Sequence, residues 1–306
     1  EVDMVVALSW VDKQFDLREK FNEAKEKLAS VGWQNLEDKI ILSACKARLD
    51  RKLINSDAEK TSEALKEQPE IITEITKNLI RVTQFLNQYC GIQSPQILPY
   101  QNQIVILAEA FRIQPEFNKE IQQQLQDWFW FTAYTELFNG IKENGIQEAL
   151  DTVRAIVKAE KKDYRYSTTI EPLGKRFNFR AARAKLLLLR LAELEPIDFK
   201  GKSINVRALL SVHGKDAVLR LFNNNSAPEN CFIFKPKQRF DFRDYLLKNN
   251  QWDTDFLQRH AISKSAAQAL QQGNENEFLS ERRQTLIEIE KAFIKPLGLD
   301  YHASAI

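Results

Sequence analysis

Six basic residues open the segment from 174 to 196, GKRFNFRAARAKLLLLRLAELEP, before its first acidic residue at position 193. Arg176, Arg180, Arg183 and Arg190 follow one another at i, i+4, i+7 and i+14. At 3.6 residues per turn this spacing predicts one arginine stripe along an α-helix whose leucines face the core. We call this predicted stripe the basic ridge.

Arginine presents a planar fork of donors that matches phosphate or carboxylate, so the basic ridge could follow a nucleic-acid backbone. The preceding run KAEKKDYRYS adds Lys161, Lys162 and Arg165 and two tyrosines that could stack on bases. We therefore expect DNA as a partner. The predicted nucleic-acid contacts are Lys161, Lys162, Arg165, Arg176, Arg180, Arg183 and Arg190.

The net charge of +2 hides a local excess of positive charge. Residues 154–190 hold eleven Lys or Arg and three Asp or Glu, a net charge of +8, so the other residues sum to −6. Such an excess favours an anionic partner. Two alternatives stay open: the ridge forms salt bridges with acidic helices of the same chain, or it faces water.

The segment DWFWFTAYTELF is the most aromatic in the chain. Trp128, Phe131 and Phe138 share one helical face, and Trp130 and Tyr134 share another. Aromatic rings can stack on bases, but a helix that is apolar almost all round is typical of a buried core. We expect core packing here.

No residue pattern indicates a catalytic or metal site. The histidines His213, His260 and His302 lack a second ligand at metal spacing, and the acidic pairs stand alone. His213 is expected at a helix end, and His260 is expected just before a Ser263 cap. Three cysteines without a C-x-x-C pairing suggest neither zinc nor disulfides. We expect no cofactor in this chain and no catalysis by it alone; a metal-dependent nuclease using His213 or His260 is the remaining enzymatic alternative.

The elements that must position these residues are helices. Only 9 Gly and 9 Pro occur, and Leu, Ala, Glu, Lys and Gln form long periodic blocks, which predicts an all-α, bundle-like, multi-helix protein, in one body or two packed subdomains. Asp16 and Asn35 are expected to cap the first two long helices, and a third is expected between Pro69 and Gly91. Residues 215–230 are expected to form a short helix and a polar loop, and the one expected strand lies in NCFIF.

We expect three regions: an N-terminal helical subdomain (1–92), a central aromatic and basic region (93–196) and a C-terminal helical subdomain (197–306). No stretch approaches eighteen consecutive apolar residues, and EVDMVVALSW lacks the basic start of a secretory signal. We therefore expect a cytoplasmic protein with no membrane partner. The start at Glu1 and the single methionine, Met4, suggest a fragment of a longer chain.

The order of several segments resembles the helical C-terminal half of the GmrSD-type, ParB-like-nuclease family of prokaryotic anti-phage restriction proteins. These segments are an early hydrophobic helix with Trp followed by FDL, GIQSPQILPYQNQIVILAEAF, LQDWFWFTAYTELFNG, the RFNFRAARAKLLLLRLAELEP helix, NCFIF, LQRHAIS and NEFLSERRQTLIEIEKAFI. Several members of that family act on modified DNA. The likeness covers nearly the whole chain by pattern rather than by a catalytic motif.

The resemblance implies a ParB-like catalytic half, marked by an Asp-Gly-Gln-Gln-Arg motif, in the same or a companion chain. That motif is not in this sequence, nor is the His-x-x-Pro element of the HNH nucleases that many members carry. Nucleotide and Mg²⁺ would then belong to the parent endonuclease or NTPase. We expect a non-catalytic module that binds nucleic acid or couples its recognition to that half. Two alternatives are a scaffold that docks on that half through the basic ridge and a degenerate HNH-like, metal-dependent nuclease.

Overall fold

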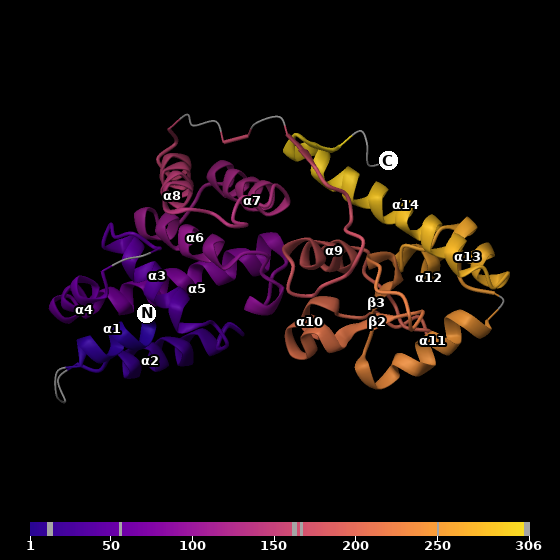
Figure 1. Cartoon of the computed structure of the whole chain (residues 1–306), viewed down its shortest axis with the longest axis horizontal. Helices are drawn as coiled ribbons and strands as arrows, with labels where there is room; N and C mark the ends of the chain where they lie inside the picture. Colours follow the sequence, from indigo (N-terminus) through magenta and orange to yellow (C-terminus); the bar gives the residue numbers. More distant parts are fainter. Residues whose placement is uncertain (11–14, 55–56, 161–163, 166–167, 250, 303–306) are drawn as a thin grey trace. The chain divides into compact units, whose positions relative to one another are not determined.

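The computed structural model divides the chain into two compact units (Figure 1). The described residues are 1–10, 15–54, 57–160, 164–165, 168–249 and 251–302. Unit 1 comprises Glu1–Pro95 and Tyr100–Tyr164, and unit 2 comprises Gln96–Pro99 and Arg165–Ile306. The short Gln96–Pro99 segment is held in unit 2, where the Leu98 carbonyl accepts a hydrogen bond from Lys185 Nζ at 2.8 Å.

The regular elements in the described part of unit 1 are all helices. Its helices are α1 (Val2–Ser9), α2 (Leu17–Ala29), α3 (Asp38–Arg48), α4 (Ala58–Glu67), α5 (Glu70–Cys90), α6 (Gln101–Ile113), α7 (Lys119–Tyr134) and α8 (Glu143–Val157), with the 3₁₀ turn η1 (Pro95–Ile97) at the boundary of the two units. Helix α6 packs against α3, α5 and α8, and α1 packs against α4. The core of unit 1 therefore surrounds α6.

Helix termini in unit 1 follow local capping chemistry. The Asp16 carboxylate accepts hydrogen bonds from the first N–H groups of α2, and α5 begins after Pro69 and ends at Gly91, whose φ of 66° is left-handed. These three predictions are confirmed. The predicted cap at Asn35 is wrong, because α3 begins three residues later, after Glu37. Residues 33–36 instead form a turn, in which Leu36 N–H donates to the carbonyl of Trp33.

The aromatic helix α7 lies in the core of unit 1, as predicted from its all-round apolarity. Trp128, Phe129, Trp130, Phe131 and Tyr134 are all at most 4% exposed. The side chain of Gln103 on α6 donates hydrogen bonds to the carbonyl of Phe129 and to Thr132 Oγ1, which fixes α7 against α6. Core packing thus explains these aromatic side chains.

Unit 2 combines helices with four three-residue strands. Its elements are β1 (Thr168–Ile170), α9 (Ala182–Glu193), α10 (Val206–His213), η2 (Gly214–Ala217), β2 (Val218–Arg220), η3 (Pro228–Asn230), β3 (Cys231–Ile233), η4 (Pro236–Gln238), α11 (Arg239–Lys248), α12 (Thr254–Arg259), α13 (Lys264–Gln271), α14 (Glu275–Ile294), η5 (Lys295–Leu297) and β4 (Leu299–Tyr301). Strand β1 pairs in parallel with β4, and β2 pairs antiparallel with β3. Helices dominate the described chain, so the all-α class is confirmed.

The strand predicted in NCFIF is present as β3, but its partner was not predicted. Residues 215–230 were expected to form a short helix and a polar loop, whereas η2 and β2 take the place of that helix and the loop that follows ends in η3. The apolar residues Val218 and Leu219 are placed by pairing with Ile233 and Phe232 of β3, a tertiary contact that overrides the local helical pattern. This correction matters because β2 lines the candidate site.

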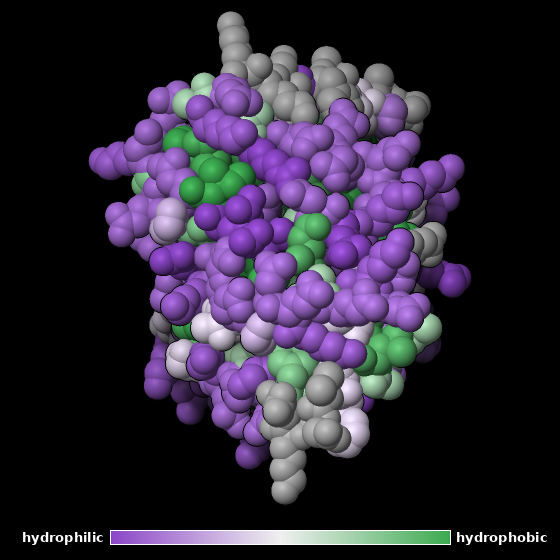
Figure 2. Space-filling model, turned by 90° about the vertical axis from the view of Figure 1, so that its left-hand side faces the viewer, coloured by the Kyte–Doolittle hydropathy of each residue, from purple (hydrophilic) through white to green (hydrophobic). Residues whose placement is uncertain are grey.

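The three predicted regions, with boundaries after residues 92 and 196, stay a prediction. The two compact units are divided between Tyr164 and Arg165, so the aromatic α7 and the basic α9 belong to different units. In the described part of the chain, no helix is both long and apolar enough to cross a membrane. Figure 2 shows the side that holds the N-terminal helices, where hydrophobic residues form separate patches among hydrophilic ones.

Candidate functional site

The predicted basic ridge is not a helical stripe, because α9 begins only at Ala182. Arg176 and Arg180 precede the helix. Asn178 makes a local turn here: its side chain accepts from the N–H of Arg180 at 3.1 Å, and its carbonyl accepts from the N–H of Ala181. Asparagine competes with helical hydrogen bonding in this way, so the helix starts later than the periodicity suggested.

Arg183 is an internal structural residue. Its guanidinium donates to the carbonyl of Glu171 and to the carboxylate of Glu290, each at 2.9 Å, and Glu290 is 2% exposed. The hydroxyl of Tyr301 donates to the same carboxylate oxygen. Arg183 therefore ties α9 to α14 and β4. For Arg183, the alternative stated above is therefore the one observed: it forms a salt bridge with an acidic residue of the same chain.

Arg190 is also removed from the surface. It is 2% exposed, pairs with Glu193 at 2.7 Å, and stacks its guanidinium 3.3 Å from the centroid of the Phe293 ring. Lys185 on the same helix is largely buried against the Leu98 carbonyl, and this burial lowers the pKa of its ammonium group. The leucine-rich helix thus buries its own cations together with its leucines.

The remaining predicted contacts divide in two. Lys161 and Lys162 lie outside the described residues. Arg165, Arg176 and Arg180 are described and have exposed side chains. Of these three, Arg180 lines a pocket of unit 2. Other cationic and aromatic side chains line the same pocket, so we describe it as the candidate site.

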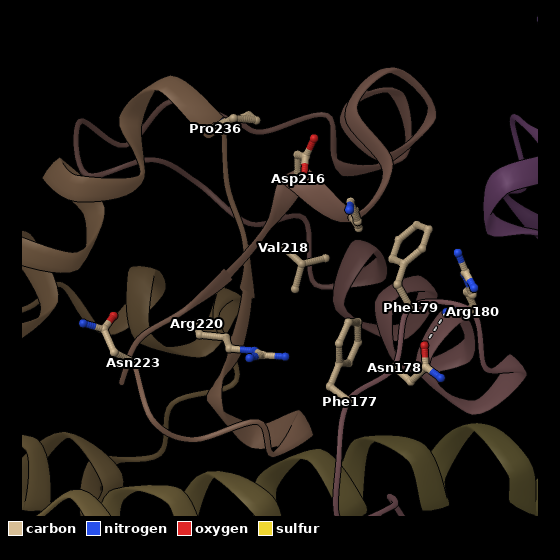
Figure 3. A pocket seen from close by; sticks show the side chains of 10 residues that line it. Phe177, Asn178, Phe179, Arg180, Asp216, Val218, Arg220, Asn223 and Pro236 are labelled. Atoms are coloured by element: carbon tan, nitrogen blue, oxygen red, sulfur yellow. Dashed lines mark hydrogen bonds between the residues drawn. The ribbon is translucent and has the colours of Figure 1, made fainter.

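This pocket, which we call the basic pocket, has a volume of about 890 Å³ (Figure 3). It is lined by Phe177, Asn178, Phe179 and Arg180 from the segment before α9, Lys215 and Asp216 from η2, Val218 and Arg220 from β2, Asn223 from the following loop, and Pro236 from η4. Segments that are about 40 residues apart in the sequence meet there. The walls combine cations, aromatic rings and amides with the carboxylate of Asp216.

Two tertiary devices hold the walls of the pocket in place. The N–H of Phe177 donates to the carbonyl of Ser226 at 2.7 Å, which joins the segment before α9 to the loop after β2. That loop is organised by Asn230, which is fully buried; its amide donates to the carbonyls of Phe222 and Asn225, and its side-chain oxygen accepts from the N–H of Phe222. The pocket is therefore built on ordered backbone.

Gly214 shapes the turn that presents η2 to the pocket. Its backbone has φ 52° and ψ −127°, a conformation that L side chains rarely adopt. A methyl group on Gly214 would lie 2.7 Å from Gln96 Oε1 and 3.9 Å from the ring of Phe179. The backbone conformation, rather than the distance to the aromatic wall, favours glycine at this turn.

We expect Gly214→Ala to lower the free energy of unfolding of unit 2 by about 1–3 kcal/mol, because the backbone strain and the contact with Gln96 must both be relieved. Urea unfolding followed by far-UV circular dichroism measures this. The matched control is Gly174→Ala, where φ is not positive and the nearest atom is 3.9 Å away. A shift no larger for Gly214→Ala than for Gly174→Ala would contradict the role given to Gly214.

The electrostatics of the basic pocket favour an anion. Arg180, Lys215 and Arg220 are exposed, and within the described ranges no carboxylate forms an ion pair with any of them. Figure 3 shows the Asp216 carboxylate away from the Arg220 guanidinium and the Phe177 ring. Residues 165–306 hold 23 Lys or Arg and 16 Asp or Glu, so unit 2 carries +7 and unit 1 carries −5.

Sequence reasoning missed most of the basic pocket. Phe177 and Phe179 were placed inside a helix, and Arg220 was placed in a helix rather than on β2. Lys215 follows the HG pair that marks the end of α10, so a helix end could be found there, but not its approach to Phe179. Of the five predicted contacts that lie within the described residues, only Arg180 lines the pocket.

The histidines give no catalytic arrangement in the structure. His260 is 3% exposed, its Nε2 lies 2.8 Å from the carbonyl of Ile197, and burial lowers the pKa of the ring to about 4. His213 ends α10, as predicted, and is exposed; Ser263 caps α13, as predicted. Within the described residues, no three His, Cys, Asp or Glu side chains are grouped so that they could hold a metal ion.

Arg282 is the most deeply buried cation of unit 2. Its guanidinium donates to the carbonyls of His260, Cys231 and Glu229 and stacks 3.6 Å from the centroid of the Phe232 ring. It joins α14 to β3, η3 and the end of α12. This is a structural role, distinct from that of the exposed cations at the pocket.

Comparisons of the chain with protein-family models, with curated proteins and with solved structures give no match.

Proposed function

We propose that unit 2 binds nucleic acid and that the basic pocket is the contact surface. The observation that supports this most is the convergence of three exposed cations, Arg180, Lys215 and Arg220, from three different segments on one concavity. Bringing like charges together costs energy unless an anion neutralises them. The two arginines offer planar donor forks suited to phosphate oxygens.

The charge of the whole unit supports the same class of ligand. A unit with +7 attracts a polyanion over a longer range than one contact does, and it raises the association rate at low salt. Arg183, Lys185 and Arg190 have internal partners, so the contact surface is smaller than the basic ridge. The proposed contact surface consists instead of residues from the segment before α9, from η2 and from β2.

We place this activity in a non-catalytic module of a cytoplasmic, GmrSD-like restriction protein, on the likeness of the segments named above. In that setting unit 2 holds the nucleic acid for a ParB-like half that supplies the chemistry. Docking of the two halves through the basic ridge is the less favoured alternative, because Arg183 and Arg190 are occupied within unit 2. The burial of His260 likewise makes a nuclease based on that ring the least favoured.

We expect Arg180→Glu/Lys215→Glu to weaken DNA binding at least tenfold at 100 mM salt. Two phosphate contacts are replaced by repulsion, and the slope of log K against log salt falls by about 1.5–2. Fluorescence anisotropy of a labelled 15-nucleotide DNA over a series of salt concentrations measures both quantities. Neither side chain makes an ion pair in the described structure, so we expect the fold to be kept.

The matched control is Lys264→Glu/Lys295→Glu, which makes the same change in net charge on exposed residues of unit 2 away from the pocket. We expect that control to reduce affinity no more than about threefold, through long-range charge alone. Equal losses for the two variants would show that net charge acts without the pocket. Undetectable binding by the wild-type chain at low salt would refute nucleic-acid binding itself, and co-purification with a ParB-like half would then favour the docking alternative.

A further inference from the structure

Phe177 and Phe179 differ from seven other phenylalanines of unit 2 in what their rings contact. Phe199, Phe222, Phe232, Phe234, Phe242, Phe256 and Phe278 each pack against at least one other aromatic ring. Within the described structure, Phe177 and Phe179 make no such ring contact, and both side chains are partly exposed in the wall of the basic pocket. The two apolar rings are thus partly exposed to water, next to the cations of the pocket.

Keeping these rings at the pocket involves specific backbone features. Phe177 is fixed by its N–H bond to Ser226, and Phe179 lies over the Gly214 turn, where a side chain larger than glycine would approach it. Asn178, between them, holds the turn that leads into α9. The sequence F-N-F therefore presents both rings on a defined segment beside the pocket rather than on a packed helix face.

The chemical groups around the rings are those that a nucleotide uses. The cations Arg180, Lys215 and Arg220 suit phosphate, the side-chain NH₂ groups of Asn178 and Asn223 can donate to a base edge, and the rings offer stacking surfaces. Figure 3 shows the Arg220 guanidinium extending toward the side of the pocket that holds Phe177. A volume of about 890 Å³ falls within the usual range for sites that enclose a small molecule.

The form of nucleic acid follows from this geometry. In a duplex the faces of the bases are covered by their neighbours, so rings set in a concave wall meet only the phosphate backbone. In a single strand a base can leave the stack and place its face on an aromatic ring. Phosphate contacts alone would serve both forms, whereas the two rings serve only the second.

We propose that the basic pocket binds an unstacked nucleotide of a single-stranded segment. Its base stacks on Phe177 or Phe179, and its flanking phosphates pair with Arg180, Lys215 and Arg220. This inference rests on the proposed nucleic-acid binding and adds that single-stranded segments are preferred over duplex. It assigns the two phenylalanines a binding role that packing does not require of them.

The test compares two labelled DNAs, a 15-nucleotide oligothymidine and a 15-base-pair duplex, by fluorescence anisotropy on the full chain. We expect the wild-type chain to bind the single strand at least tenfold more tightly. Phe177→Leu/Phe179→Leu keeps the apolar bulk but removes the aromatic faces; we expect it to weaken single-strand binding by about tenfold or more and to leave duplex binding within twofold. Phe179→Trp, which keeps a stacking face, is expected to retain the preference.

The matched control is Phe240→Leu, a 72% exposed phenylalanine of α11 that does not line the pocket. We expect it to bind both DNAs as the wild type does. If the double leucine variant keeps the wild-type ratio of affinities while Arg180→Glu/Lys215→Glu loses binding, the stacking site is refuted and the proposed function stands. If the wild-type chain binds neither DNA, both fall. A thermal midpoint within a few degrees of the wild type confirms that each variant is folded.

Discussion

Replacing Arg282 with methionine is expected to lower the free energy of unfolding of unit 2 by about 3–5 kcal/mol. Arg282 is fully buried, and its guanidinium donates hydrogen bonds to the carbonyls of three residues. These are Cys231 at 2.9 Å, His260 at 3.2 and 3.3 Å, and Glu229. Methionine has a similar reach and fills much of the space. It cannot donate a hydrogen bond.

The large effect comes from what the substitution leaves behind. Exchanging a buried ion pair for apolar side chains can be neutral when both partners are replaced, but here the carbonyls belong to the backbone and stay in place. Each buried carbonyl without a donor costs about 1–3 kcal/mol. The stacking of the guanidinium on Phe232 is lost as well.

Arg282→Lys separates the charge from the geometry. Burial lowers the pKa of Arg282 to about 9, so the arginine is still a cation at neutral pH. Lysine replaces its planar fork of donors with a single amino group, whose charge the same burial opposes more strongly. A single ammonium cannot span three carbonyls on two sides, so we expect the lysine variant to lose about half as much stability as the methionine variant. A lysine variant with wild-type stability would show that charge alone is needed.

Urea unfolding followed by circular dichroism measures the loss, and hydrogen exchange of the peptides around β3 and α12 assigns it to unit 2, since two units can unfold separately. Arg259→Met is the control. Arg259 is about one-third exposed and pairs with Asp255 one helical turn away, so we expect a loss of at most about 1 kcal/mol. Similar losses in the two variants would contradict the central place of Arg282 in the fold.

Local chemistry made part of this fold predictable. The cap at Asp16, the helix between Pro69 and Gly91 and the buried aromatic α7 each depend on residues within a few positions of one another, and all three are found. The strand β3 was marked by its β-branched and aromatic residues. In each case the element's own sequence determined the outcome.

The basic ridge failed because its outcome depended on distant residues. Periodicity shows that Arg183 and Arg190 share a helix face, but not that Glu290 and Phe293 of α14 cover that face a hundred residues later. The start of the helix failed for a local reason, since Asn178 makes a turn that ends the pattern at Ala181. The predicted helix was thus too long at its N-terminal end, and the two arginines of the ridge that do lie on α9 have structural roles.

The basic pocket was hidden from the sequence for a related reason. Its groups come from a turn, a 3₁₀ segment and a strand that pairs with β3, and none of these has a strong periodic signal. What could have been found is the F-N-F tripeptide, because an Asn between two aromatic residues before a helix favours a turn that exposes side chains. The convergence on Lys215 and Arg220 required the tertiary structure.

The pH dependence of stability is expected to carry the signature of His260. The ring is 3% exposed and lies among Phe232, Phe242 and Phe256, with 4.4 Å between its centroid and that of Phe256. Burial is the main cause that lowers the pKa of His260 to about 4 from an ordinary value of 6.5; the hydrogen bond to Ile197 opposes this shift, and the charge of Arg282 contributes to it. The folded protein therefore holds a neutral imidazole.

The sign follows from proton linkage. Between pH 6.5 and pH 4 the unfolded chain binds a proton at His260 and the folded chain does not, so acid stabilises the unfolded state. The stability that the neutral ring provides is complete above pH 6.5 and is lost as the pH falls to about 4. At 1.36 kcal/mol per pH unit, the loss amounts to about 3 kcal/mol.

His260→Gln isolates this effect from the titration of carboxylates, which is common to both proteins. The glutamine amide can still donate to the Ile197 carbonyl but does not titrate. We expect the wild type to be the more stable by a constant amount above pH 7, and this advantage to shrink by about 3 kcal/mol at pH 4, as measured by urea unfolding at each pH. A difference in stability that stays constant down to pH 4 would contradict this prediction, because His260 would then titrate alike in the folded and unfolded states. The buried ring would have to gain a proton without a cost in free energy. Its aromatic surroundings and the nearby Arg282 cation oppose such protonation.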